Sequence, residues 1–499
     1  MELRFKRWEC DHLDPVVQEV RNQELTQELR LGEGMPDVGQ VLCAWGQSLL
    51  RSKEWRRGSV SVSGGMMVWV LYIPEDGGAE QCLEGWIPFQ TEWDLPENVP
   101  DGSLRVRCLT RFVDARAVTP RKLMLRAGIG VMAEAWVPAS VELAQPEALP
   151  DFVELKQSTW PVHLAVEAGE KQITLDEELE LPSSGPVPEK LLLCRLEPQV
   201  TEKRVVGNKL VFRGNGNLHA LFRSPEGQLY SREFELPFSQ FTELDREYGP
   251  DARADVILTP TALEPELDEE GRLRFRGGAA AQYVVTDRKL LTLGEDAYSP
   301  SRELELQSET RELPVLLETR RENLYGEQTV QGDARETVDV CFLPEFPRQR
   351  RTGEGLELTV PGQFQVLYYG SDGRLAASTA RWEGSCLLPV GEDTCMAAQP
   401  VAGELPSAAL REGQLTVRCQ VPLELAAMAR QRFSMISALT PGEPVPPDPA
   451  RPSLILCRAG DRGLWEIARE AGTTAAAIRR ANGLQEEPAP DRMLLIPVP

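Results

Sequence analysis

Apolar and polar residues alternate with a period of two over most of the chain. Residues 104–109 read LRVRCL, and the same alternation continues through residues 210–221. Such a pattern buries one face of a strand and leaves the other in water, whereas a helix would repeat every 3.6 residues. Glycine-containing turns at 206–209, 225–227 and 371–373 can join these runs as hairpins. The pattern therefore predicts a mainly β protein.

This alternating pattern occurs three times, at a spacing of about 150 residues. The clearest series is an apolar stretch that ends at Cys43, Cys194 and Cys341. Two further series keep the same register: a proline followed by valine at 15–16, 161–162 and 314–315, and an alternating run at 123–126, 273–276 and 415–418. A unit of about 150 residues is the size of one compact domain and is longer than a solenoid module.

We therefore predict three repeated all-β domains, each folded as a sandwich or barrel. Residues 14–29 could form an amphipathic helix, but their register with the other two copies favours extended structure. The predicted boundaries are 1–145, 146–297 and 298–439 for the three repeats. A linker follows at 440–453, because six prolines in that stretch favour an extended spacer.

The pattern changes after the linker, in residues 454–499. Leu464, Ile467, Ala468 and Ala471 recur at the spacing of one helix face. Gly472 can end that helix, and Thr473 or Thr474 can cap a second one that stops at Asn482 and Gly483. Short apolar runs at 454–458 and 493–498 read as strands. The segment is predicted to fold as strand, helix, helix, strand.

Charge and composition exclude several classes of function. The net charge is −23, and it belongs entirely to the part before residue 454, since the six arginines that follow balance six acids. An acidic surface repels nucleic acid and anionic lipid. The first thirteen residues, MELRFKRWECDHL, lack the apolar core of a secretory signal, and no apolar run approaches a membrane span. We expect a cytoplasmic protein whose Cys43, Cys194 and Cys341 are reduced and buried.

No catalytic motif stands out. The chain has no phosphate-binding loop, no HExxH and no paired CxxC, and its three histidines, His12, His163 and His219, are far apart. Residues 128–133 match a loose dinucleotide fingerprint, but they lie within an alternating run and open no helix. The acidic runs at 176–178 and 268–270 are typical of solvated loops. We predict that the protein is not an enzyme and uses no cofactor or metal.

The C-terminal segment resembles a LysM domain. The resemblance depends on Gly460-Asp461, on the run from Leu464 to Ala468 that contains Trp465, on Thr473-Thr474, on Asn482-Gly483-Leu484 and on residues 494–497. In LysM domains, two loops line a groove for polymers of N-acetylglucosamine. Here the first loop has two residues, Arg462 and Gly463, where the family usually has one, and the second lacks the usual glycine after Pro490.

With such a tail, the three repeats resemble the SPOCS domains of spore-coat morphogenetic proteins, and the whole chain is similar to the SipL family. This resemblance implies a sporulation protein of the mother-cell cytoplasm that docks on the forespore surface and helps to assemble the spore coat. The implied partners are the coat base-layer ATPase SpoIVA, or a protein like it, and other coat proteins. If the protein ends in a crosslinked coat, Cys386 and Cys395 are the better candidates for disulfide pairing.

Two binding functions remain open for the tail: recognition of a coat protein, or of peptidoglycan. Arg479, Arg480 and Trp465 are of residue types that often anchor interfaces. The other predicted binding residues come from the LysM resemblance. Core packing is the equal alternative for Leu464 and Trp465. The predicted partner- or glycan-binding residues are Asp461, Leu464, Trp465, Arg479, Arg480, Asn482 and Leu484.

Overall fold

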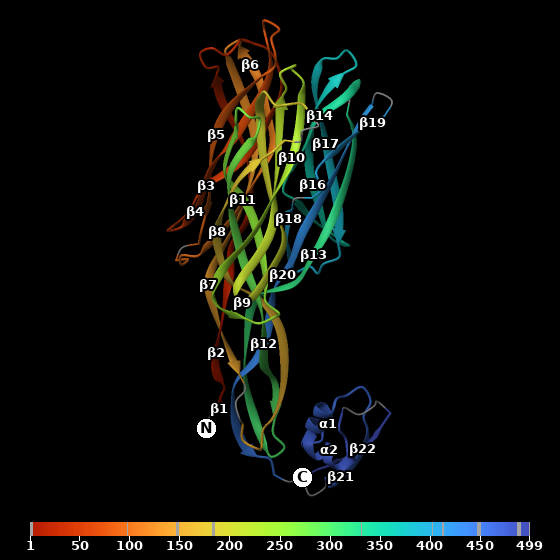
Figure 1. The fold of residues 1–499 in the computed structure, drawn as a ribbon. Helices are drawn as coiled ribbons and strands as arrows, with labels where there is room; N and C mark the ends of the chain where they lie inside the picture. Colours follow the sequence, from red (N-terminus) through yellow and green to blue (C-terminus); the bar gives the residue numbers. More distant parts are fainter. Residues whose placement is uncertain are drawn as a thin grey trace.

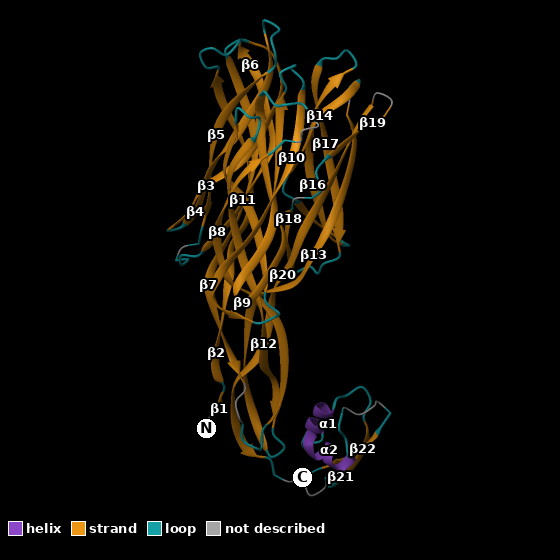
Figure 2. Ribbon diagram, in the orientation of Figure 1, coloured by secondary structure: helices purple, strands orange, loops and turns teal. Residues whose placement is uncertain are grey.

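The structure is a computed structural model that describes residues 3–96, 98–145, 149–181, 185–330, 332–401, 403–411, 414–446, 451–486 and 491–498. Long strands run along an elongated body, and a small module that contains both helices lies beside the end of the body where the N-terminus is found (Figure 1 and Figure 2). The prediction of a mainly β protein is confirmed.

The first part of the body contains two antiparallel sheets. One consists of β2 (Lys6–Arg30), β7 (Lys122–Gln145) and β6 (Ser103–Thr119), with β7 in the centre. The other consists of β3 (Val38–Arg56), β4 (Ser59–Pro74) and β5 (Gln81–Asp94), with β4 in the centre. Residues 14–29 are extended within β2, as their register predicted.

The second part repeats this arrangement with longer strands. One sheet consists of β8 (Glu154–Leu179), β12 (Leu273–Tyr298) and β11 (Arg253–Leu267), with β12 in the centre. The other contains β9 (Lys190–Arg223) and β10 (Leu229–Tyr248). Within β9, Gly207 has φ 59°, and Thr201 Oγ1 donates a hydrogen bond to the carbonyl of Arg213. The strand therefore folds back at the predicted glycine turn.

The third part has the same plan with additional breaks. One sheet centres on β20 (Gln414–Pro444), which pairs with β13 (Arg302–Val330), β18 (Thr394–Pro400), β19 (Ser407–Arg411) and the short β1 (Leu3–Arg4). The other contains β14 (Ala334–Pro344), β15 (Arg348–Thr352), β16 (Gly355–Gly370) and β17 (Leu375–Leu388). β20 continues into the first residues of the predicted linker, since residues 440–444 belong to this strand and Pro444 pairs with Arg302. Residues 146–148, at a predicted boundary, and 447–450 of the linker lie outside the described residues.

One β-bulge recurs in all three parts at the same register. The first strand of each part skips one residue against its long central partner, at Val16, Val166 and Leu317. A bulge of this kind bends the strand and increases its twist. The first strands therefore bend at equivalent places, and each proline–valine pair lies at the bulge or within five residues before it.

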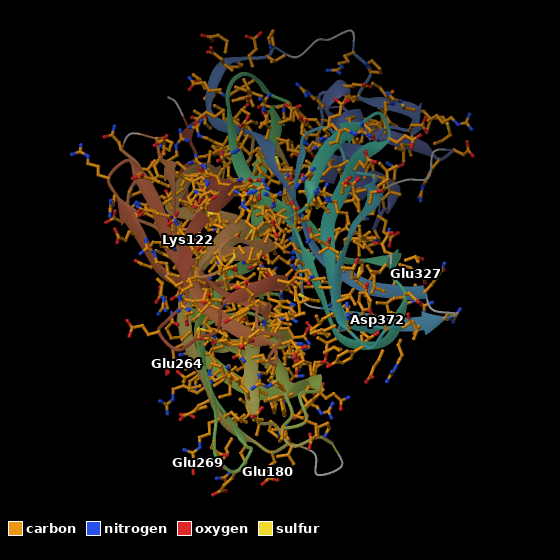
Figure 3. All side chains as sticks on the ribbon, turned by 90° about the horizontal axis from the view of Figure 1, so that it is seen from above. Lys122, Glu180, Glu264, Glu269, Glu327 and Asp372 are labelled. Atoms are coloured by element: carbon orange, nitrogen blue, oxygen red, sulfur yellow. The ribbon has the colours of Figure 1, made fainter. Side chains whose placement is uncertain are left out.

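Besides separate apolar clusters within the first part and within the third part, one large apolar cluster spans all three parts. It joins Trp45 and Trp69 of the first part to Leu193 and Phe212 of the second and to Cys341 of the third. In the view down the long axis, the three parts lie side by side around a common centre (Figure 3). The parts are therefore packed against one another and are not separated as beads on a string.

Buried glutamine side chains connect the strands across these contacts. Gln282 of β12 donates from Nε2 to the carbonyl of Val106 (2.7 Å) and accepts from the backbone N–H of Val106 (2.8 Å). Gln47 of β3 makes the same pair of bonds with Leu196 of β9 (2.6 and 2.8 Å). These amides help to satisfy backbone groups that are buried at the junctions; the carbonyl of Val106 also accepts from the hydroxyl of Thr259 (2.7 Å).

Among the described residues, no helix combines the length and the apolar composition needed to cross a membrane. Both helices belong to the C-terminal module.

Candidate functional site

The C-terminal module, residues 454–498, folds as its sequence pattern predicted. It contains β21 (Leu454–Arg458), α1 (Leu464–Glu470), α2 (Ala475–Asn482) and β22 (Met493–Pro497). Thr474 caps α2 by accepting a hydrogen bond from the N–H of Ala477 (3.0 Å). Gly472 and Gly483 follow the two helices with φ 60° each, the left-handed conformation that glycine adopts without strain.

Two of the predicted binding residues form the core of this module. Leu464 is 1% exposed and Leu484 is 9% exposed, and both pack with Ile467, Ile478 and Leu494. Both side chains are buried within the module, which fits the core-packing alternative, and their role in binding stays a prediction. They belong to the motif because burial of apolar area holds the two helices on the small sheet.

A third predicted residue, Asn482, connects α2 to β22. Its Nδ2 donates to the carbonyls of Ile478 (2.8 Å) and Leu495 (2.6 Å), and its Oδ1 accepts from the N–H of Leu495 (2.8 Å). The amide thus pairs with both backbone groups of Leu495 at the open edge of a two-stranded sheet. These contacts give Asn482 a structural role.

Trp465 faces the body of the protein. Its ring lies edge-on to the ring of Tyr298, the last residue of β12, with centroids 5.2 Å apart. The cations of Lys156 and Arg469 lie over the indole at 5.4 and 5.3 Å. Such cation–π contacts are stabilising where the ring is shielded from water. The side chain that sequence analysis nominated for an external ligand is therefore engaged within the chain.

Tyr298 is the central residue of this docking contact. It is 8% exposed and belongs to the apolar cluster of the C-terminal module, although it comes from the body. Its hydroxyl donates to the carbonyl of Thr473 between the two helices (2.8 Å). Burial raises the pKa of the Tyr298 hydroxyl well above its ordinary value, so it stays protonated and keeps donating.

Ion pairs surround this aromatic contact. Lys156 of β8 pairs with Glu466 of α1 (3.0 Å), and Arg469 of α1 pairs with Asp296 of β12. The hydrogen bond between Lys156 and Glu466 raises the pKa of the lysine and lowers that of the carboxyl group. Both side chains are about two-fifths exposed, so the pair orients the module more than it stabilises it. No local sequence pattern marks Tyr298, Lys156 or Asp296 as part of this contact.

The remaining three predicted residues lie on the surface. Asp461 follows Gly460 in the turn between β21 and α1, and Arg479 and Arg480 lie in the last turn of α2. All three are exposed. The structure does not bring them together with Trp465 into one site: α1 presents Trp465 to the body, whereas Arg480 is open to water.

Charged residues also meet where the three parts of the body join. Arg105 of β6 pairs with the buried Glu134 of β7 and with Asp255 of β11 (2.5 Å), and Lys203 of β9 bridges Asp255 (3.0 Å) and Glu424 of β20 (3.2 Å). Burial alone would raise the pKa of Asp255, but the charges of Arg105 and Lys203 outweigh it and hold the pKa well below its usual range. One alternating chain of charges thus connects all three parts.

A second buried cluster joins the second and third parts. His219 Nε2 lies 2.7 Å from Asp339 Oδ1, and Arg195 lies between Asp339 and the thiol of Cys341. Burial raises the pKa of Cys341 to about 11, so the thiol is protonated at neutral pH and is a weak nucleophile. This arrangement stabilises the junction and is poorly suited to nucleophilic chemistry.

All ten cysteines are free thiols. Cys194 and Cys341 are buried, as the sequence predicted, whereas Cys43 is only partly buried. Cys395 is exposed and Cys386 is partly buried. In the part of the chain that the structure describes, no group of three or more histidine, cysteine and acidic residues is placed to hold a metal ion.

Comparison with known proteins identifies one segment of the body. Residues 188–263 match the family model described as SipL, SPOCS domain. The matched segment contains β9, β10 and most of β11, the part of the second unit that provides Arg195, Lys203, His219 and Asp255 to the junctions. No curated protein and no solved structure matches the chain.

Proposed function

We propose, from the match of residues 188–263 to the SipL, SPOCS domain family model, that the chain is SipL-like and that its function is related to sporulation. On that premise, we propose that it is a structural adaptor, without enzymatic activity, that helps to assemble the spore coat on the forespore surface through protein–protein contacts. The observation that carries this proposal is the SPOCS match in a body whose parts are joined by a common core and by buried ion pairs.

The rigid body suits an adaptor because its surfaces keep fixed positions. Three parts locked to one another present their outer faces in a constant geometry, and several contacts on one chain raise the avidity of assembly. The proposed partner is a base-layer coat ATPase of the SpoIVA kind, with other coat proteins, and the proposed location is the mother-cell cytoplasm at the forespore surface.

The C-terminal module is proposed to be a LysM domain that recognises this partner. Its strand, helix, helix, strand order and its capped helices fit that fold. Because Leu464, Leu484 and Asn482 hold the module together and Trp465 faces Tyr298, recognition would use residues that remain on the surface.

Binding of the purified ATPase to the full chain and to a chain ending at Pro444 tests this proposal. We expect the full chain to bind and the shortened chain to lose most of the affinity. Equal binding by both would remove the role of the C-terminal module, and no binding by either would contradict the adaptor function. A fluorescent fusion of each chain, imaged in sporulating cells, tests the proposed location in the same way.

Peptidoglycan binding is the second candidate, and one observation favours it. Asp461 is exposed in the loop between β21 and α1, the loop that the LysM resemblance places at the glycan groove. Sedimentation of the full chain with purified peptidoglycan, compared with the Asp461→Ala variant and the chain ending at Pro444, tests this function. Glycan binding predicts that both changes reduce sedimentation.

A further inference from the structure

A cavity of about 380 Å³ lies where the three parts of the body meet. Strands of all three parts form its wall: β7 of the first, β8, β11 and β12 of the second, and β13, β18 and β20 of the third. The wall includes the exposed side chains of Arg253 and Arg321, so the cavity opens to water. Its volume falls in the range of small-molecule sites, about 300–1,000 Å³. We call it the junction cavity.

The three recurring β-bulges border the junction cavity. In each part, one residue of the central strand lies opposite the position just before the bulge. A second residue lies two positions earlier and shares its face of the strand. All six residues line the cavity: Trp136, Thr286 and Met428, and Glu134, Val284 and Ala426. The three central strands therefore turn equivalent faces to one space. Because bulges re-aim side chains next to functional sites, this space is a feature of the repeated plan.

Positive charge exceeds negative charge in the wall, although the whole chain carries −23. The cationic side chains that line the cavity are Arg105, Lys203, Arg253, Arg320 and Arg321. The acidic ones are Glu134, Asp255 and Glu424. Such a local excess attracts anions and repels metal ions and other cations.

The excess charge belongs to Arg253 and Arg321. Each of the other cations has an acidic partner: Arg105 and Lys203 pair with the three acids of the wall, and Arg320 with Glu322 (3.5 Å). Within the described part of the chain, no acid lies at ion-pair distance from Arg253 or Arg321. Arg253 Nη1 donates to the hydroxyl of Thr319 (3.4 Å), two residues before Arg321 on β13. Both guanidinium groups are therefore available to one anion.

A buried amide lies beside these charges. The register places Arg321 and Gln399 on either side of Glu424, in one row across β13, β20 and β18, and all three residues line the cavity. Gln399 is 6% exposed, and its amide has no hydrogen-bond partner among the described residues. The indole N–H of Trp136, 4% exposed, has no acceptor among them either. Unpaired buried groups of this kind are rare, and an occupant with oxygen atoms supplies their partners.

The rest of the wall is apolar. Ala165 and Val284 form an apolar cluster with Trp136, and Met428 packs against it. An inorganic anion satisfies the arginines but leaves this surface in contact with water, which is unfavourable. An occupant that joins an anionic head to an apolar chain suits both halves of the wall.

We propose that the junction cavity is a binding site for a small amphipathic carboxylate. Its carboxylate lies at Arg253 and Arg321, and its aliphatic chain lies against Ala165, Val284 and Met428. This site goes beyond the adaptor function and does not depend on it. Because the occupant contacts all three parts, its binding stabilises the folded body against unfolding.

The test is isothermal titration calorimetry of the full chain with octanoate. Octylamine and octanamide carry the same chain on a cationic and a neutral head, and acetate carries the same head without the chain. The variant Arg253→Gln with Arg321→Gln removes the excess charge. Arg57→Gln with Arg213→Gln is the matched control, because it makes the same charge change at two exposed arginines outside the wall. Ala426→Leu fills the cavity from a half-buried position of its wall.

We expect octanoate to bind the wild-type chain and the control variant with equal affinity, and to raise the unfolding temperature of both. The Arg253 and Arg321 variant should bind octanoate at least about tenfold more weakly, and Ala426→Leu should weaken it to a similar degree. Octanamide and acetate should bind the wild-type chain more weakly than octanoate, and octylamine should bind most weakly.

Three results overturn the proposal. No binding of octanoate by the wild-type chain means that water alone fills the cavity. Equal affinity of the charge variant and its control removes the role of the two arginines, and tighter binding of octylamine reverses the expected sign of charge. Undiminished binding by a folded Ala426→Leu chain places octanoate elsewhere. Circular dichroism without ligand checks folding; if Ala426→Leu does not fold, the two arginine variants, which change exposed side chains, decide the outcome.

Discussion

The carboxylate of Asp339 is the buried negative charge that faces two cationic side chains at the junction of the second and third parts. It is 2% exposed and faces both His219 and Arg195. Asp339→Asn would leave the buried Arg195 without its counter-charge, and the loss of one member of a buried pair costs about 3–5 kcal/mol. Urea unfolding should show this decrease in the free energy of unfolding. Asp372→Asn, at an exposed turn, is the control and should change it by less than about 0.5 kcal/mol.

His219 makes this junction sensitive to pH. Burial lowers the pKa of His219, but the negative charge of Asp339 outweighs burial and raises it above the ordinary value. A raised pKa means that the folded protein binds the proton more tightly than the unfolded chain. The resulting stability is complete below about pH 6.5, the unfolded value, and is lost as pH rises through the folded pKa. The free energy of unfolding should therefore fall as the pH rises from about 6.5 through the folded pKa of His219. His219→Gln should remove this pH dependence of the free energy of unfolding.

Asn482 shows why a motif residue need not be a binding residue. Asn482→Ala removes three hydrogen bonds and leaves the backbone groups of Leu495 without their side-chain partner. We expect a loss of about 1–3 kcal/mol from the stability of the C-terminal module. Hydrogen exchange at the amides of α2 and β22 should quicken accordingly. Arg480→Ala, on the exposed side of α2, should leave these rates unchanged; similar rates in both variants would contradict the structural role.

At the scale of elements, the docking of α1 on the ends of β8 and β12 can be broken at one residue. Tyr298→Ala removes the ring that packs on Trp465 and the hydroxyl that bonds to Thr473. The flanking ion pairs are exposed and weak, so we expect the module to leave the body. Small-angle X-ray scattering should show a larger radius of gyration for Tyr298→Ala than for the wild-type chain. Hydrogen exchange at the backbone amides of α1 should also become faster. Tyr298→Phe keeps the ring and should retain most of the docking.

The elements themselves were largely predictable, because strands and helix caps depend on local patterns. The period-two alternation marked the strands, and Thr474, Gly472 and Gly483 marked the helix ends that the structure shows. The continuation of β20 into the predicted linker could not be foreseen, because prolines at the end of a strand are tolerated where they need not donate to the ladder. Pro441 and Pro444 lie in the last part of β20.

The interpretation of the candidate site was less successful, because it depends on contacts between distant residues. Leu464 and Leu484 fit the motif whether they bind a ligand or fill the core, and only their burial separates these roles. The orientation of Trp465 depends on Tyr298, which no local pattern connects to it. The exposed apolar side chains of β21 and β22 could be inferred from the alternation in these strands only after the helices were placed on the other face.

At the scale of the whole molecule, the shared core predicts that the body behaves as one cooperative unit. Trp45, Leu49, Trp69 and Leu71 of the first part pack with the second and third parts, so isolation of residues 1–145 would expose them to water. We expect that fragment to bind a hydrophobic dye and to aggregate. Calorimetry of a chain ending at Pro444 should show one transition with equal calorimetric and van't Hoff enthalpies. Three separate transitions would show independent domains.

The glutamine bonds across the junctions give this cooperativity a specific test. Gln282 is 1% exposed and pairs with both backbone groups of Val106 in the neighbouring part, and it also accepts from Lys53 (2.9 Å). Gln282→Ala leaves the buried N–H of Val106 without this partner, whereas the carbonyl of Val106 keeps the hydroxyl of Thr259 and Lys53 keeps Glu170. The unsatisfied N–H should cost about 1–3 kcal/mol. If the body is one unit, the single calorimetric transition moves to lower temperature as a whole. If the parts are independent, the transition instead splits, because the first and second parts separate before either unfolds.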